Sequence, residues 1–203
     1  GDWIGAQRGP HWRMPFGPMP VIRTQNKDPT FEMRKALTAA AANHGCPMLW
    51  LNDEDADVSN IQDTLVFTSE HLDTSYANLA PKGEVDLVVI GCPQASIGEV
   101  RATAAAVRTW MELGHHIPEQ RLWVFTSGHN HGILKNDGTI DILEEAGALI
   151  LKDTCPEVTP YNRTRYNHLL TNSLKAEHYL TSGLNRMPTS VARIEECVAV
   201  AFD

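Results

Sequence analysis

Four consecutive apolar residues, 87–90, form the clearest hydrophobic segment of the chain. A short apolar run without polar alternation is typical of a strand buried on both faces, as in parallel sheets. Runs of the same kind lie at residues 121–125, 148–152 and 168–172, and a shorter one at 48–51. We predict that each of these segments is a strand and that residues 87–90 are the central one.

Apolar residues spaced three and four positions apart follow the central strand. Val100 and Val107 belong to such a stripe, which predicts a helix at about 97–113 that packs on a sheet. Ser96 precedes this helix, and Glu99 three residues later gives the spacing of a capping box. The pattern therefore predicts both the helix and its first residue.

Strand and helix alternate four or five times along the chain. Further helices are predicted at about 30–44, 58–63, 69–79, 140–146, 173–180 and 191–201. This alternation predicts an α/β fold with a mostly parallel sheet, flanked by helices on both faces and connected by right-handed crossovers. In open sheets of this class ligands bind where the strands end, so the residues that follow each strand are the candidates for chemistry.

Two of the three Cys-Pro dipeptides come just after predicted strands. Cys92 follows the central strand, and Cys155 follows the strand at 148–152. The two thiols could meet at one sheet edge as a pair of ligands, or each could be the small buried hydrophobe that a lone cysteine usually is. Cys46 precedes its strand and therefore belongs at the opposite end.

Polar residues at two further strand ends suit an anionic ligand. Ser127 follows the strand at 121–125, and Thr171, Asn172 and Ser173 lead into a helix whose first turn contains Lys175. A helix N-terminus with capping hydroxyls and a lysine can bind a carboxylate or a phosphate. The same residue types also simply cap helices, and the local pattern leaves both interpretations open.

Composition limits the class of protein. The 203 residues suffice for one generous α/β domain, and a net charge of -8 argues against a nucleic-acid partner. No apolar run approaches the roughly 18–20 residues of a membrane span, and no secretory signal is visible. Four widely spaced cysteines do not form a disulfide pattern. We expect a reduced, cytoplasmic protein.

Residues 1–28 differ from the rest of the chain. They contain several prolines and tryptophans without helical or strand periodicity. We interpret them as an extended arm or domain junction, and residues 29–203 as a single α/β domain.

Several segments together resemble a known family. They are VDLVVIGCPQAS, LWVFTS, EEAGALILKDTCPEVTP, LLTNSLKAEHY and IEECVAVA, which cover roughly residues 85–203. In this order and spacing they are similar to the C-terminal part of aconitase X, an aconitase-related family of hydro-lyases. Residues 30–51 fit the same family more loosely. The resemblance implies an aconitase-like α/β domain.

The resemblance also implies a chemistry. Members of the family are dehydratases that hold an iron–sulfur cluster or an iron centre on three cysteines, and they remove water from cis-3-hydroxy-L-proline or from mevalonate 5-phosphate. By position, the metal ligands correspond to Cys92 and Cys155. An iron with an open position can act as a Lewis acid on a leaving hydroxyl. The residues expected around the small hydroxy acid substrate are Ser127, Thr171, Asn172, Ser173 and Lys175.

The chain departs from the family in two respects. The segment with the third cysteine, similar to Thr-Cys-Thr-Pro-Tyr, is missing, and so is the small swivelling domain whose Gly- and Ser-rich segment supplies the catalytic base. We therefore expect an iron-ligand domain that is inactive alone and needs the remaining large-subunit domains and the small subunit. The Cys-Pro of DTCP favours the hydroxyproline substrate. The alternative is a non-catalytic α/β binding module derived from the same fold.

Overall fold

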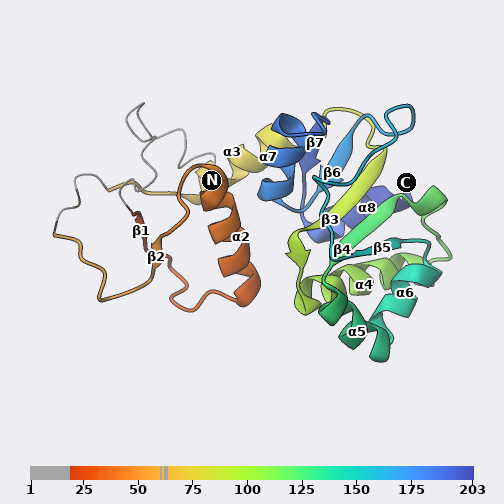
Figure 1. Ribbon diagram of the computed structural model, residues 1–203, viewed down its shortest axis with the longest axis horizontal. Coiled ribbons are helices and arrows are strands. Elements are labelled where there is room, and N and C mark those ends of the chain that lie inside the picture. Colours follow the sequence, from red (N-terminus) through yellow and green to blue (C-terminus); the bar gives the residue numbers. More distant parts are fainter. Residues whose placement is uncertain (1–18, 60, 62–63) are drawn as a thin grey trace. The chain divides into compact units, whose positions relative to one another are not determined.

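The computed structural model describes residues 19–59, 61 and 64–203. The chain divides into two compact units, Gly1–Asp73 and Thr74–Asp203, which we describe separately (Figure 1). The sequence pattern instead predicts a boundary near residue 28, which falls within the first unit. Most of the extended arm expected before that boundary lies outside the described residues, so the arm stays a prediction.

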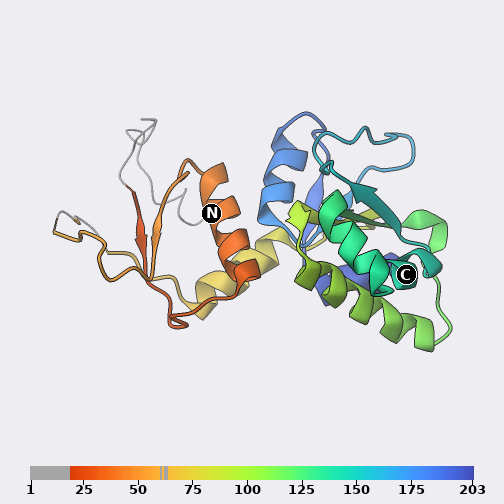
Figure 2. The same cartoon turned by 60° about the horizontal axis from the view of Figure 1, so that its bottom comes forward.

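The described residues of the first unit include a helix and two short strands. Strands β1 (Val21–Ile22) and β2 (Trp50–Leu51) pair in parallel, and helix α2 (Phe31–Asn43) lies between them in the chain (Figure 2). Thr30 caps this helix by accepting a hydrogen bond from the backbone N–H of Met33 at 3.3 Å. Both α2 and β2 are predicted from the sequence, whereas β1 is not.

The segment that follows is largely irregular. The apolar residues 65–67 predict a short strand or a turn, but residues 64–68 form neither helix nor strand. The helix predicted at 58–63 falls partly outside the described residues, and those that are described are not helical. The helix predicted at 69–79 is confirmed, because α3 spans Ser69–Leu79.

The second unit is built on one five-stranded sheet in which every pairing is parallel. Its spatial order is β5-β4-β3-β6-β7, with β3 at the centre. The strands are β3 (Leu87–Ala95), β4 (Leu122–Thr126), β5 (Leu149–Lys152), β6 (Leu169–Thr171) and β7 (Thr189–Val191). The predicted fold class and the central strand are confirmed, while β7 is an additional strand.

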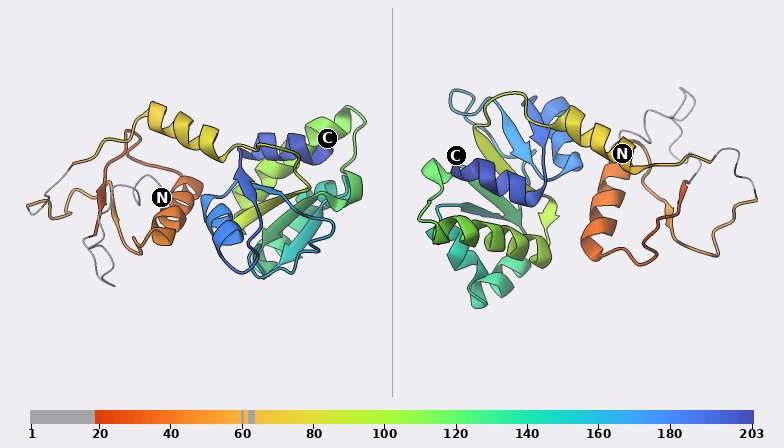
Figure 3. Two further views of the ribbon diagram at one scale, coloured as in Figure 1. Left: turned by 90° about the horizontal axis from the view of Figure 1, so that it is seen from above. Right: turned by 180° about the vertical axis from the view of Figure 1, so that it is seen from behind.

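Helices cover both faces of this sheet (Figures 1 and 3). They are α4 (Ile97–Glu112), α5 (Gly128–Asn136), α6 (Thr139–Glu145), α7 (Leu174–Ser182) and α8 (Ile194–Phe202). Successive side chains of a strand point to opposite faces. Val88 and Ile90 therefore enter the core with α4, α6 and α8, while Leu87 and Val89 enter the core with α7. All four side chains are fully buried, as predicted for the central strand.

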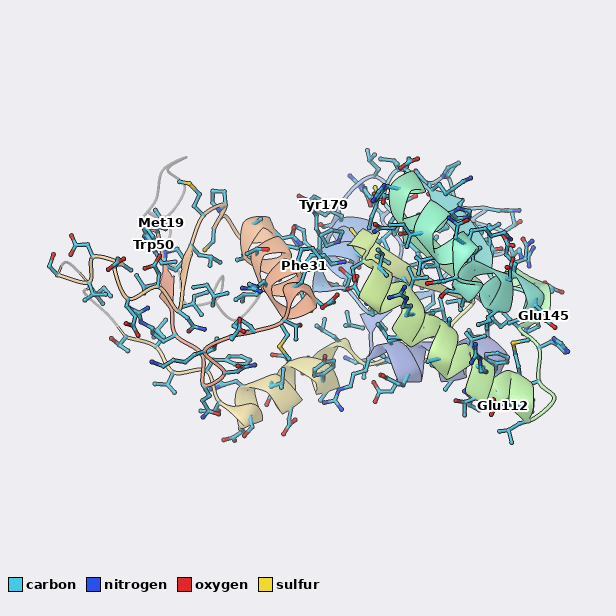
Figure 4. All side chains as sticks on the ribbon, turned by 90° about the horizontal axis from the view of Figure 1, so that it is seen from below. Met19, Phe31, Trp50, Glu112, Glu145 and Tyr179 are labelled. Carbon is cyan, nitrogen blue, oxygen red and sulfur yellow. The ribbon has the colours of Figure 1, made fainter. Side chains whose placement is uncertain are left out.

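Helix α4 begins as the sequence predicts. The hydroxyl of Ser96 accepts a hydrogen bond from the N–H of Glu99 at 3.1 Å, and the Glu99 carboxylate accepts one from the N–H of Ser96 at 2.8 Å. At their other ends, α4 and α6 finish at Glu112 and Glu145, whose side chains are exposed (Figure 4). No helix in the described part of the chain is long and apolar enough to cross a membrane.

Candidate functional site

Cys92 lies within the distorted end of the central strand. The sequence predicts that this strand stops at Gly91, but β3 continues to Ala95, and its register with β4 shifts between Ile90 and Ala95. Gly91 has a φ of +108°, a conformation that glycine adopts readily, and this bends the strand without ending it. The hydroxyl of Thr126 then donates to the carbonyl of Ala95 at 2.8 Å. Cys92 is thereby fixed at the carboxyl edge of the sheet, 8% exposed.

Cys155 lies in the loop that follows β5 and is half-buried. A hydrogen bond from the side-chain amide of Gln94 to the carbonyl of Thr154, 3.0 Å long, joins this loop to the end of β3. This hydrogen bond links the segment of Cys92 to the segment of Cys155, although strand β4 lies between β3 and β5 in the sheet. The structure therefore places Cys92 and Cys155 at the same edge of the sheet.

The side chain of Tyr161 is close to both cysteines. Burial raises the pKa of this phenol well above its usual range, and the negative charges of Cys155, Glu157 and Cys92 add to the effect. The ring is 8% exposed and stacks on Trp123, with 5.7 Å between centroids. Cys92 and Tyr161 belong to the same buried cluster. The sequence gives no local signal for this tyrosine, which lies in an irregular loop.

Ser127 lies at the predicted sheet edge, where it caps α5. Its hydroxyl accepts a hydrogen bond from the N–H of Asn130 at 3.1 Å. The carboxylate of Asp153 lies at the same helix terminus and accepts from the N–H of Gly128 at 2.7 Å. Because helix N-termini favour negative charge, this position already holds an anion that belongs to the chain itself.

The N-terminus of α7 is the second place where polar candidates gather. Ser173 caps the helix by accepting from the N–H of Ala176 at 3.1 Å, and its hydroxyl donates to the carbonyl of Cys92. Thr171 is fully buried and accepts from the N–H of Ser173 at 3.3 Å. These two hydroxyls are engaged within the fold.

Asn172 and Lys175 are less engaged. The side-chain oxygen of Asn172 is buried without a hydrogen-bond partner among the described residues. The ammonium of Lys175 lies 6.0 Å from the ring centroid of Tyr179 on α7 (Figure 4), and within the described chain the structure gives it no ion pair. The first turn of α7 contains Lys175 and also one acidic residue, Glu177.

The remaining cysteines lie elsewhere. Cys197 is fully buried in the core under α8, as predicted, and burial together with the charge of Glu196 raises the pKa of its thiol to about 12. Cys46 is buried in the first unit, and none of the four cysteines, all of which lie in the described residues, forms a disulfide bond. Among residues 19–59, 61 and 64–203, no group of three His, Cys, Asp or Glu side chains could hold a metal ion. The described residues thus offer two thiols at the same edge of the sheet and no third ligand.

A hollow of about 660 Å³ lies at the opposite edge of the sheet. Val85 and Arg121, at the amino ends of β3 and β4, contribute to its lining together with Arg165. The guanidinium of Arg165 pairs with Glu119 at 2.9 Å. This hollow is separated from both thiols by the length of the strands.

Comparison with known proteins identifies the family. The family described as the aconitase X third domain matches residues 85–203, more than half of the chain. A phosphomevalonate dehydratase large subunit from Methanothermobacter thermautotrophicus is 29% identical over 159 residues, which are 75% of this chain and 38% of that protein. The protein of the same name from Methanocaldococcus jannaschii is 36% identical over 99 residues, which are 49% of this chain and 23% of that protein.

A solved structure agrees with the sequence matches. The holo-form of Thermococcus kodakaraensis aconitase X superposes with a TM-score of 0.75 at 21% identity, over 96% of this chain and 48% of that one. At this identity the likeness concerns the fold. The chain spans less than half the length of these relatives. Because residues 85–203 match the aconitase X third domain, the chain belongs to the aconitase X family.

Proposed function

We propose that this aconitase X chain is the iron-ligand domain of a dehydratase that removes water from mevalonate 5-phosphate. The observation that supports it is the placement of Cys92 and Cys155 at the carboxyl edge of one parallel sheet, joined through Gln94. The related proteins cited above are phosphomevalonate dehydratase large subunits, which favours this substrate. The hydroxyproline substrate expected from the DTCP segment has no support among them.

The two thiols fit an iron–sulfur cluster or a mononuclear iron as part of its ligand set. Both are soft donors; Cys92 lies in the distorted end of β3 and Cys155 in the loop after β5, at the same edge of the sheet. A bound iron with an open position would supply Lewis-acid assistance to the departing hydroxyl. Since two ligands do not complete such a site, a third must come from outside the described residues. In this proposal Cys92 and Cys155 hold the metal, and the rest of the large subunit completes it.

The phosphate of the substrate is assigned to the N-terminus of α7. Lys175 in the first turn and the position at a helix N-terminus suit an anion. The alternative terminus, at Ser127 on α5, already carries the carboxylate of Asp153. Asn172, with its unpartnered oxygen, is placed to accept a hydrogen bond from a substrate hydroxyl.

The chain requires partners in this proposal. The related phosphomevalonate dehydratases are named as large subunits, and this chain spans 38% and 23% of the two cited above. The remaining large-subunit domains would bring the third metal ligand, and the small subunit would bring the catalytic base. The chain alone is therefore expected to be inactive.

The test is assembly of the complete large subunit that contains this chain with its small subunit under anaerobic conditions. We expect iron to bind and mevalonate 5-phosphate to lose water, with no turnover of cis-3-hydroxy-L-proline. Cys92→Ser and Cys155→Ser should each abolish the bound iron, whereas Cys197→Ala, a buried cysteine away from the site, should retain it. Full iron content in both serine variants would refute the assignment and support a non-catalytic module.

The phosphate assignment has its own test in the same assembly. Removing a charge-assisted hydrogen bond costs roughly 1.5–3 kcal/mol, so Lys175→Ala should raise KM for mevalonate 5-phosphate about 10- to 100-fold. The control is Lys82→Ala, which removes an exposed lysine from a loop remote from this edge. Equal KM values for the two variants would exclude Lys175 from the phosphate site.

A further inference from the structure

Two hydroxyls hold the backbone on either side of the peptide bond that joins Cys155 to Pro156. The hydroxyl of Thr159 donates to the carbonyl of Cys155 at 2.9 Å. The phenol of Tyr161 donates to the carbonyl of Pro156 at 3.0 Å. The Tyr161 ring is itself fixed by stacking on Trp123 of β4. The Cys155 loop is therefore attached both to its own following turn and to the sheet.

A third hydroxyl holds the other cysteine in the same manner. Ser173, the cap of α7, donates to the carbonyl of Cys92. It accepts at the same time from the N–H of Ala176 at 3.1 Å, so the start of α7 and the end of β3 are joined through one oxygen. Each of the two cysteine carbonyls is thus paired with a side-chain hydroxyl.

The sequence explains why such donors are needed. A proline has no N–H to donate, and the residue before it is restricted to extended conformations, so a Cys-Pro segment forms fewer backbone hydrogen bonds than other dipeptides. Buried backbone carbonyls still require donors. Hydroxyls from Thr159, Tyr161 and Ser173 supply them, and the backbone that carries each thiol is fixed before any ligand arrives.

We propose that Ser173, Thr159 and Tyr161 are positioning residues that hold the thiols of Cys92 and Cys155 ready to bind one metal ion together. This inference rests on the proposed function, since it concerns the same site. Groups that orient metal ligands through hydrogen bonds typically contribute a factor of roughly 10 to 100 in metal affinity. The three hydroxyls act through the peptide backbone rather than by touching metal or substrate.

Hydrogen-bond counting separates this role from substrate binding. A hydroxyl has one proton to donate. In Ser173 that proton is used for the carbonyl of Cys92, and in Tyr161 for the carbonyl of Pro156. Ser173, which the sequence suggests as a substrate contact, therefore has no donor left for a phosphate and acts on Cys92 instead.

The experiment uses the metal-free chain and Cd²⁺, whose thiolate complexes absorb in the ultraviolet. We expect one Cd²⁺ to bind per chain with an absorption band that disappears in Cys92→Ser and in Cys155→Ser. Thr159→Val and Tyr161→Phe should each weaken Cd²⁺ binding by about tenfold or more while the circular dichroism stays unchanged.

Matched controls isolate the hydroxyl from the side chain. Thr109→Val removes an exposed hydroxyl that bonds within α4, and Tyr166→Phe alters a second tyrosine packed on Trp123 to which the described structure gives no hydroxyl hydrogen bond. Both should bind Cd²⁺ like the unmodified chain. Ser173→Ala should weaken binding and Ser173→Thr, which keeps the hydroxyl, should restore it.

Three results would overturn the inference. The first is that Thr159→Val and Tyr161→Phe bind Cd²⁺ as tightly as the controls. The second is that the absorption band survives both cysteine substitutions. The third is that the unmodified chain shows no Cd²⁺ band at all. Failure of the proposed function is a separate result, because the assembled enzyme would then not dehydrate mevalonate 5-phosphate although the Cd²⁺ measurements held.

Discussion

Gly91 is the position where a single added carbon should disturb both the fold and the site. Its φ of +108° is a conformation that residues with a side chain rarely adopt, which costs about 1–3 kcal/mol. A Cβ at this position would also overlap the backbone carbonyl oxygen of Phe125 on β4 and come within 3.0 Å of the backbone nitrogen of Ala95. Overlap inside a packed core adds about 1–3 kcal/mol. Gly91→Ala should therefore lower the free energy of unfolding by about 2–6 kcal/mol.

The assay is urea unfolding followed by circular dichroism, supported by thermal unfolding, where each kcal/mol corresponds to about 2–4 °C in Tm. Gly138→Ala is the matched control, because Gly138 also has a positive φ, of +80°, but a Cβ there meets nothing within 4 Å. It should lose only about 1–2 kcal/mol. If the two variants were equally stable, the overlap with Phe125 would not exist and the bend that positions Cys92 would be misplaced.

Three further substitutions test other parts of the second unit. Ser96→Ala removes the cap of α4 and should cost about 1 kcal/mol in urea unfolding, with no loss if the cap does not form. Leu87→Ala creates a cavity in the fully buried central strand and should cost about 2–5 kcal/mol, against less than about 0.5 for the 81% exposed Leu184→Ala. Cys197 tests pH dependence, because its pKa is raised from 9.0 to about 12. The unfolded thiol ionises above pH 9 while the folded one keeps its proton, so stability should fall by about 1.4 kcal/mol per pH unit between pH 9 and 12. Urea unfolding at several pH values should show this contribution in the unmodified chain and not in Cys197→Ala; parallel curves would contradict it.

The elements predicted correctly are those whose own residues determine them. The strand at 87–90 is apolar on both faces because both faces are buried, and α4 carries its cap and its apolar stripe within one segment. Strand β7 is only three residues long and lies at the edge of the sheet, so its pairing with β6 rather than its composition makes it a strand. Helix α5 has one buried residue, Leu134, and too little apolar periodicity to be recognised.

The candidate site divides in the same way. Cys92 and Cys155 are marked by the proline that follows each and by the strand that precedes it, and both signals are local. Gln94 and Tyr161 have no comparable local sequence signal. The partner of Gln94 is 60 residues away in the chain, and Tyr161 stacks on a tryptophan of another strand. Residues that join distant segments are defined by tertiary packing, so the pattern of a single sequence does not reveal them.

Ser127 and Ser173 show how far local pattern can mislead about function. Each follows a strand and caps the next helix, and the sequence treats the two as equivalent anion sites. Their surroundings differ, because Asp153 from another loop places its carboxylate on the helix of Ser127, whereas Ser173 donates its proton to the carbonyl of Cys92. The proposed function therefore assigns the anionic group of the substrate to α7, whose cap residue Ser173 is also hydrogen-bonded to the backbone of Cys92. The proposed metal and phosphate positions are thus linked through one side chain, so displacement of the Ser173 hydroxyl should alter both.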